Sequence, residues 1–184
     1  MAIEPKGIIV HSMSEYFERD ALKWLSRYNK ETNTFDGTPL HQYPNPIHAP
    51  DWLVYSRLSV HGFISPNGDW IAGRAVPEKA AHAGKSIFGN LSGLNSHFLG
   101  FEMLVPGVNN YSQFINKIAT AGTFSSAQRE TALAKCREWM ATYNISSNAV
   151  VGHSEVSGDD VRGPGKGKRD PGSSFDMDAF RGDL

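Results

Sequence analysis

Residues 150–156 read Val-Val-Gly-His-Ser-Glu-Val, and residues 168–172, after a glycine-rich loop, read Lys-Arg-Asp-Pro-Gly. The first stretch is a short apolar run that delivers His153 to a loop. The second stretch returns Asp170, whose backbone is restricted by the proline and glycine that follow it. A third polar residue, His11, ends another apolar run near the start of the chain. If these three side chains converge, they predict a zinc site with an open coordination position, which is the site of a hydrolase.

The bulk properties of the chain fit one globular domain. Its 184 residues allow one hydrophobic core, so we expect a single domain over residues 1–184, present as a monomer. A formal net charge of −1 gives no overall basic field, which argues against nucleic acid as a partner. The single cysteine, Cys136, excludes an internal disulfide bond. No apolar segment is long enough for membrane insertion and the N-terminus lacks a signal-peptide core, so we expect synthesis in the cytoplasm.

Hydrophobic patterning predicts short strands alternating with helices. The run Ile8-Ile9-Val10 is typical of a buried strand, and residues 98–105 indicate a central strand. Ser125 and Gln128 have capping-box spacing, which predicts a helix that begins near residue 126. The complete prediction has strands at 7–13, 98–105 and 149–152, a hairpin at 57–76, helices at 15–28, 126–143 and 175–180, and irregular segments at 29–50 and 77–96.

Helical spacing also predicts which side chains are buried. Cys136 falls on the apolar face of the predicted helix 126–143, so we expect it to be a small buried hydrophobe. In the predicted helix 15–28, Phe17, Trp24 and neighbouring apolar residues recur at helical spacing. They should form a buried stripe.

His11, His153 and Asp170 are ambiguous when each is considered alone. A histidine at the end of a buried strand is usually structural, and an aspartate before Pro-Gly is typical of a turn. The combination is more specific, because zinc hydrolases use two imidazoles and one carboxylate with a fourth position left for water. Such a site keeps a net positive charge that acidifies water and polarises a carbonyl group. We therefore predict Zn²⁺ as the cofactor.

Glu102 and Lys168 are the candidate catalytic residues. Glu102 interrupts an apolar strand, where a carboxylate is costly unless it is paired or functional. It could act as a general base, or it could face solvent on a half-exposed strand. Lys168 precedes Asp170 by two residues, so in an extended segment its ammonium would point toward the same site and stabilise an oxyanion. Lys166 competes for that position, and both lysines could instead belong to a solvated basic loop.

Two further histidines are candidate substrate-binding residues. His82 lies among small residues in the sequence Ala-Ala-His-Ala-Gly, which would let a ligand approach the backbone. His61 belongs to the predicted hairpin and either lines the cleft or packs in the core. The chain has no His-Glu-x-x-His motif, no paired cysteines, no phosphate-binding loop and no Gly-x-Ser-x-Gly elbow.

The order of these motifs resembles the zinc-dependent N-acetylmuramoyl-L-alanine amidases of the type 2 amidase and peptidoglycan recognition protein superfamily. The resemblance covers most of the chain, although residues 29–50 and 158–167 are longer than is usual in the family. Any single motif is weak evidence, but the order of all of them is specific. The matching segments are 8–12, 58–64 with 67–68, 81–86, 95–102, 151–154 and 168–176.

The resemblance implies an α/β fold with a central mixed β-sheet flanked by helices and a zinc cleft at the strand ends. It implies that His11, His153 and Asp170 are the zinc ligands, that Glu102 is the catalytic base and that Lys168 is catalytic. Relatives that only bind peptidoglycan generally lack the third ligand, so Asp170 favours catalysis.

The resemblance also implies a substrate and a reaction. The expected reaction is hydrolysis of the amide between N-acetylmuramic acid and L-alanine in peptidoglycan or a muropeptide. An endolysin that degrades the cell wall is one setting for this activity. A cytoplasmic amidase that recycles muropeptides and a non-catalytic peptidoglycan-binding module are the alternatives.

Overall fold

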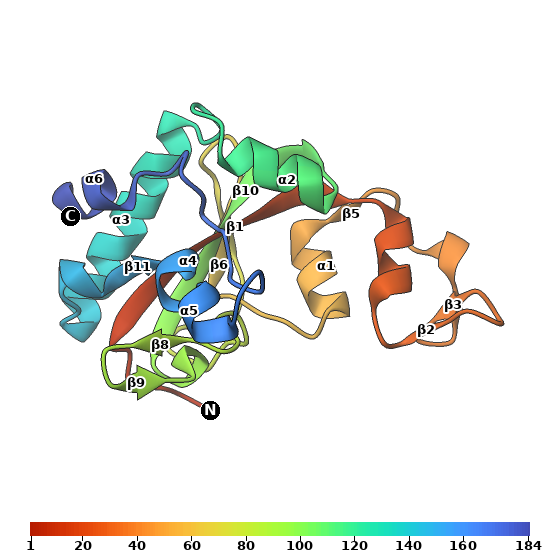
Figure 1. The fold of residues 1–184 in the computed structure, drawn as a ribbon, viewed down its shortest axis with the longest axis horizontal. Coiled ribbons are helices and arrows are strands. Elements are labelled where there is room, and N and C mark those ends of the chain that lie inside the picture. The colour runs from red at the N-terminus through yellow and green to blue at the C-terminus, as the bar shows by residue number, and fades with distance from the viewer.

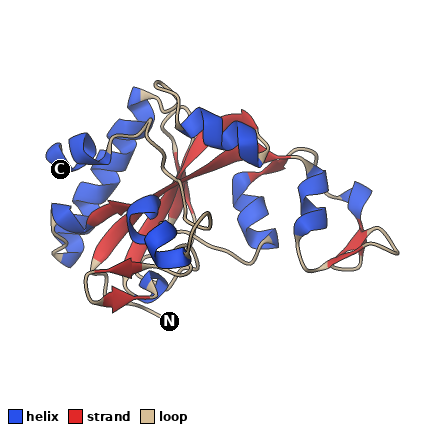
Figure 2. Cartoon of the chain, viewed as in Figure 1, coloured by secondary structure: helices blue, strands red, loops and turns tan.

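A computed structural model describes residues 1–184 and shows a central sheet with helices on both faces (Figure 1, Figure 2). Its two long strands, β1 (Gly7–Phe17) and β10 (Phe98–Val108), pair in parallel at the centre. The strand order is β11-β1-β10-β6-β7, and β5 pairs with the far end of β1. The predicted strands at 7–13, 98–105 and 149–152 are confirmed, although β1 and β10 are longer than predicted.

The shorter strands make the sheet mixed. Two of them run parallel to their neighbours and two run antiparallel, so the predicted α/β fold with a mixed sheet is confirmed. The parallel strands are β11 (Val150–Gly152) and β6 (Gly62–Ile64), and the antiparallel strands are β7 (Trp70–Ala72) and β5 (Ile47–His48).

The central strands are buried on both faces because helices cover each side of the sheet. On β10, Leu99, Phe101 and Met103 point to one face and pack with Cys136 and Trp139 of α3 (Ser126–Tyr143). The even-numbered residues of β10 point to the opposite face. That opposite face carries the polar residues described below, so α3 forms a hydrophobic backing for the site.

Short helices surround the polar face of the sheet. Leu53 of α1 packs near Leu104 of β10, and Val156 of α4 packs near Phe98. These contacts place helix ends and loops around the end of β1 (Figure 1). The helices other than α3 are α1 (Ala49–Tyr55), α2 (Tyr111–Ile118), α4 (His153–Val156), α5 (Asp159–Arg162) and α6 (Met177–Gly182), with 3₁₀ turns at Arg19–Trp24, Leu40–Gln42, Leu94–Ser96 and Ser147–Ala149.

The predicted helix over 126–143 is confirmed, together with its cap. The Gln128 backbone N–H donates to Ser125 Oγ at 3.1 Å, and the Ser125 N–H donates to Gln128 Oε1 at 3.1 Å. The Gln128 side chain also donates to the Leu104 carbonyl oxygen at 2.9 Å, which ties the start of the helix to the sheet. Cys136 is fully buried, as predicted.

The predicted helix over 15–28 is wrong. Residues up to Phe17 continue β1, because Tyr16 and Phe17 pair with β5 across the sheet. The chain then forms only a 3₁₀ helix over Arg19–Trp24. Trp24, expected in a buried stripe, is 77% exposed.

Residues 19–47 form a side unit that projects from the sheet at the right of Figure 1. The segment 29–50, predicted to be irregular, contributes a three-stranded sheet to it. The unit has its own small core, in which Leu22, Phe35, Leu40 and Ile47 are buried together. Its strands are β2 (Tyr28–Asn29), β3 (Thr34–Phe35) and β4 (Thr38–Pro39).

The remaining predictions hold in part. The hairpin at 57–76 is present as β6 and β7, but its strands are shorter than predicted. The segment 77–96, predicted to be irregular, contains one two-stranded ribbon, β8 (Ile87–Phe88) and β9 (Leu91–Ser92). The terminal helix predicted over 175–180 begins at Met177. No helix combines the length and hydrophobicity needed to cross a lipid bilayer.

Candidate metal centre and active site

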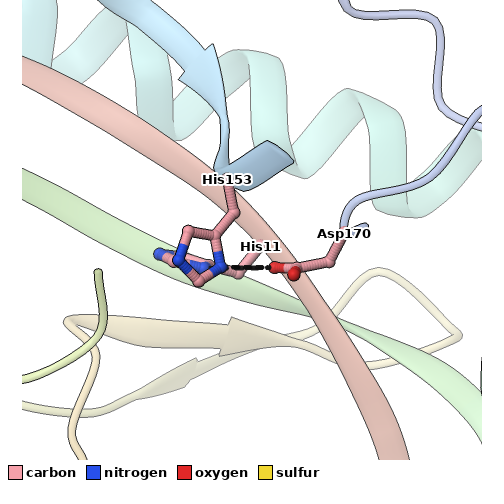
Figure 3. Close-up of side chains that lie close together, drawn as sticks. All are labelled: His11, His153 and Asp170. Carbon is pink, nitrogen blue, oxygen red and sulfur yellow. Dashed lines mark hydrogen bonds and ion pairs between the residues drawn. The ribbon is translucent and has the colours of Figure 1, made fainter. Parts of the chain in front are cut away.

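Three polar side chains from distant parts of the chain meet above the end of β11. His11 lies on β1, His153 is the first residue of α4 directly after β11, and Asp170 lies in the loop before α6. Figure 3 shows the Asp170 carboxylate pointing at the two imidazole rings. The structure thus brings together the three residues predicted as metal ligands, and their ligand atoms all lie within 4.8 Å of one another.

The contacts within this cluster are short and shielded from solvent. Asp170 Oδ2 lies 3.0 Å from His153 Nδ1 and 3.3 Å from His11 Nδ1. His11 and His153 are only 1% and 3% exposed. A buried group of this kind is stable only if its charges and lone pairs are matched.

The outer ring nitrogens determine which atoms face the centre of the cluster. His153 Nε2 donates to the Ala83 carbonyl oxygen at 3.2 Å, and His82 Nε2 donates to the Phe98 carbonyl oxygen at 3.2 Å. A carbonyl oxygen can only accept, so both Nε2 atoms carry hydrogen. In a neutral imidazole the other nitrogen is then an acceptor. His82 Nδ1 therefore accepts from His11 Nε2 at 2.8 Å, which leaves His11 Nδ1 without hydrogen.

With neutral imidazoles, three acceptor atoms converge with no proton between them. They are His11 Nδ1, His153 Nδ1 and Asp170 Oδ2. Lone pairs that face one another repel, so this arrangement calls for a cation at the centre of the cluster. The residues present thus fit a metal ion, since each supplies a free lone pair and two have an outer hydrogen bond that fixes the ring.

The pKa values of His11 and His82 agree with neutral imidazole rings. Burial, and then the neighbouring His153, lowers the pKa of His11 to about 4, so its imidazole is neutral near pH 7. Burial and the neighbouring His11 also lower the pKa of His82 well below its usual value. Burial alone would raise the pKa of the Asp170 carboxyl, but the two imidazoles outweigh it and lower the pKa. Asp170 is therefore an anion.

The contact between His11 and His82 depends on a glycine. A Cβ atom built on Gly100 of β10 would lie 2.5 Å from His82 Nδ1 and 3.2 Å from His11 Nε2. The backbone N–H groups of His82 and Ala83 donate to Asn95 Oδ1 at 2.9 and 2.7 Å, which fixes the segment that carries His82. His82, predicted to bind substrate, therefore contacts a metal-ligand candidate directly.

Glu102 lies beside the cluster and has an unused acceptor. It is 9% exposed, and its Oε2 atom has no hydrogen-bond partner. Burial and the negative charge of Asp170 raise the pKa of the Glu102 carboxyl well above its usual value, while Lys168 acts in the opposite direction. A buried carboxylate oxygen without a partner is costly in a folded protein and indicates a functional group.

Lys168 reaches the same cleft, whereas Lys166 does not. The Lys168 backbone N–H donates to the Ser157 carbonyl oxygen at 2.8 Å. Asp159 organises the preceding loop, since its Oδ1 accepts from the Gly167 N–H at 2.7 Å. This register places Lys168, but not Lys166, among the residues that line the cleft.

The cluster opens into a cleft of about 550 Å³. His82 lines this cleft, but His61 does not. The His61 ring is buried, and its nitrogens contact the backbone of Gly100 and the Glu78 carbonyl oxygen. Of the two alternatives for His61, its contacts match packing in the core.

Sequence reasoning missed part of the cleft lining. Aromatic side chains from β1, the side unit, α1 and α2 line it. The helical spacing of Trp24 predicts burial, so it does not indicate a position in the cleft. The polar residues around them gave no spacing signal of their own. The aromatic lining residues are Phe17, Trp24, Trp52, Tyr111 and Phe114.

Comparison with known families gives one match that covers nearly the whole chain. The profile of a family described as N-acetylmuramoyl-L-alanine amidase matches residues 2–173. This range includes His11, Glu102, His153, Lys168 and Asp170. No curated protein sequence matches the chain.

Solved structures share the fold at low sequence identity. The crystal structure of a selenomethionine derivative of AmpD has a TM-score of 0.61 and 21% identity, covering 98% of this chain and 85% of that chain. The endolysin LysCS from Clostridium intestinale has a TM-score of 0.55 and 18% identity, with coverages of 98% and 83%. AmiD from E. coli, solved with an anhydro-N-acetylmuramic acid tripeptide substrate, has a TM-score of 0.54 and 18% identity, with coverages of 100% and 58%.

Proposed function

The chain belongs to the N-acetylmuramoyl-L-alanine amidase family, and on that premise we propose that it is a zinc-dependent amidase of peptidoglycan. The scissile bond is the amide between the lactyl group of N-acetylmuramic acid and L-alanine. One observation carries the proposal: three lone pairs, from His11, His153 and Asp170, converge beside the unpartnered carboxylate oxygen of Glu102. Solved neighbours bound to muropeptides support the substrate class.

The donor set favours zinc over other metal ions. Two imidazole nitrogens and one carboxylate form a borderline-soft set of three, which zinc hydrolases use with a fourth position open. When bound, zinc would polarise the scissile carbonyl and make water easier to deprotonate. The outer hydrogen bonds from His11 to His82 and from His153 to Ala83 fix the two rings, so that His11 and His153 would hold the ion through their Nδ1 atoms.

Glu102 acts as the general base and then as the general acid. Its free Oε2 accepts the proton of the water that attacks the amide carbon. The same carboxyl then delivers this proton to the amine of L-alanine as the carbon–nitrogen bond breaks. Its raised pKa suits both steps, since a base poised nearer neutrality also returns the proton readily.

Lys168 stabilises the oxygen that becomes negative during the attack. It lines the cleft together with Glu102 and Asp170, and its charge is close enough to act on the pKa of Glu102. A fixed positive charge in a partly desolvated site stabilises an oxyanion more than it would in water.

The biological role we propose is degradation of cell-wall peptidoglycan, as by an endolysin acting at the wall. The open cleft with exposed lining residues supports a polymeric substrate rather than only a small fragment. Rates on intact sacculi and on soluble anhydro-muropeptides test this role. A rate confined to the soluble fragments would instead assign the chain to muropeptide recycling.

The deciding experiment measures release of peptides with free N-terminal L-alanine from purified cell wall, together with zinc content. We expect bound zinc, release of such peptides, and loss of both after chelation. Binding to cell wall without any release would show a non-catalytic binding module. Cleavage of peptides that lack muramic acid would show a general peptidase.

A further inference from the structure

The cleft contains exposed aromatic rings that the proposed chemistry does not use. Seven large hydrophobic side chains are exposed on the molecule, and three of them, Trp24, Leu58 and Tyr111, line this one cleft. Trp24 is 77% exposed and Tyr111 is 70% exposed. Scattered exposed hydrophobic residues need no explanation, but large rings gathered in a cleft beside a candidate active site indicate a ligand surface.

The packing of the side unit leaves Trp24 exposed to solvent. Its helix buries Leu22 fully in the unit's core, next to Phe35, and leaves Trp24 outside. The guanidinium of Arg27 lies 4.7 Å from the centre of the Phe35 ring and forms an ion pair with Asp36. The side unit is therefore packed around a core of its own. Because Leu22 occupies that core, Trp24 of the same 3₁₀ helix is left exposed.

The surroundings of Trp24 combine aromatic rings with carboxylates. Phe17 and Trp52 line the same cleft and stack on each other, with ring centres 4.7 Å apart and planes 18° apart. Glu18 and Asp20 line it as well, and Asp20 forms an ion pair with Lys23 at 2.8 Å. Aromatic rings and acceptor oxygens that line one cleft form a surface of mixed character, which suits a ligand with both apolar faces and hydroxyl groups.

A pyranose ring has this chemistry. Its C–H groups form an apolar face that packs on the electron-rich face of an aromatic ring, and its hydroxyls donate to carboxylates. The opposite charge is found at Arg169, which also lines the cleft and, beside its ion pair with Asp159, can bind a carboxylate of a stem peptide. The two ends of a muropeptide therefore have different complementary surfaces in one cleft.

We propose that Trp24 and Tyr111 form a saccharide-binding subsite that holds sugars of the glycan strand beyond the muramic acid. The assignment of these sugars to a peptidoglycan strand rests on the proposed amidase function. The subsite itself rests on the exposure, the stacking and the carboxylates described above. It binds polymeric glycan more tightly than a single muropeptide, because more sugar rings contact it.

Binding of a peptide-free probe, tetra-N-acetylchitotetraose, tests the subsite by calorimetry and by tryptophan fluorescence. We expect Trp24→Ala and Tyr111→Ala each to weaken binding about tenfold, and Trp24→Phe to retain most of it, because a ring remains. Ile87→Ala is the matched control, since Ile87 is 45% exposed on β8 and lies outside the cleft. Its affinity should equal that of the parent protein.

Equal affinity of Trp24→Ala, Tyr111→Ala and the parent would overturn the subsite. No measurable binding of the probe by the parent would overturn it as well. Because this readout needs no turnover, it separates the two proposals. Probe binding that depends on Trp24 in a protein without amidase activity would sink the proposed function and leave the subsite standing.

Discussion

His11 of β1 and Glu102 of β10 occupy the same register position on neighbouring parallel strands. Strands in a sheet lie about 4.8 Å apart, and paired residues point to the same face. The pairing of the two central strands therefore sets the distance between a candidate ligand and the candidate base. His11 is a candidate metal ligand, whereas Glu102 is the candidate base. Substituting one of them at a time should therefore separate metal binding from proton transfer.

Asp170→Ala should abolish both zinc binding and activity. The substitution removes the only anionic ligand candidate and leaves two imidazoles facing an empty position. Loss of an outer-shell partner alone costs roughly 10- to 100-fold in metal affinity, so loss of a ligand should cost about 100-fold or more. Zinc content after dialysis and muropeptide cleavage measure the two effects. Full cleavage by this variant would exclude the assigned metal site.

Glu102→Gln should retain zinc and lose activity. Gln keeps the shape of the side chain but cannot accept the proton, and general acid–base catalysis contributes about 10²- to 10⁴-fold. We expect unchanged zinc stoichiometry with a fall in kcat of that order. A variant that loses zinc would show instead that Glu102 supports the metal site.

Lys168→Met should lower kcat by about 10²-fold with a smaller change in KM, as expected for a group that acts on the transition state. Lys166→Met is the matched control, because Lys166 lies in the same loop but does not line the cleft. Steady-state kinetics of the two variants on one muropeptide decide the register of this loop. A defect in Lys166→Met alone would reverse the assignment.

His82→Ala should weaken zinc binding by about 10- to 100-fold, because His11 Nε2 loses its hydrogen-bond acceptor. His82→Asn should recover part of the affinity, since an amide oxygen can accept from the same nitrogen. Competition with a chelating dye measures both variants. If His82→Ala binds zinc as tightly as the parent, His82 does not position His11.

As the solution is acidified, the protein should lose its activity at a higher pH than the pH at which it loses bound zinc. Burial and Asp170 raise the pKa of Glu102, so falling pH protonates the base above the usual carboxyl range. The pKa of His11 is lowered to about 4, so protons compete for this ligand only at lower pH. The profile of kcat/KM and the zinc content should be measured on the same samples. Loss of both at one pH would contradict this assignment.

Local sequence patterns correctly predicted those helices and strands whose packing in the fold matches their own hydrophobic and capping patterns. Residues 126–143 carry a capping box and an apolar face, and both are present in α3. Residues 98–105 form the central strand because their apolar side chains are covered on both faces. The helix predicted over 15–28 fails because Tyr16 and Phe17 pair with β5, a contact with residues about 30 positions away that periodicity does not reveal.

The sequence predicted the three candidate ligands, but it did not predict the contacts that hold them in place. The order of motifs identified His11, His153 and Asp170, which the structure brings together. The hydrogen bond between His11 and His82 depends on Gly100, whose missing side chain leaves the space for it. Such a contact joins three separate segments, and no spacing within one segment encodes it.

The site is assembled from segments far apart in the sequence, since His11 and Asp170 are 159 residues apart. A ribosome therefore adds the last candidate ligand 159 residues after the first. A nascent chain that stops before residue 170 has two imidazoles and no carboxylate to complete the set. A messenger RNA truncated before the Asp170 codon therefore encodes a chain that lacks one of the three candidate ligands.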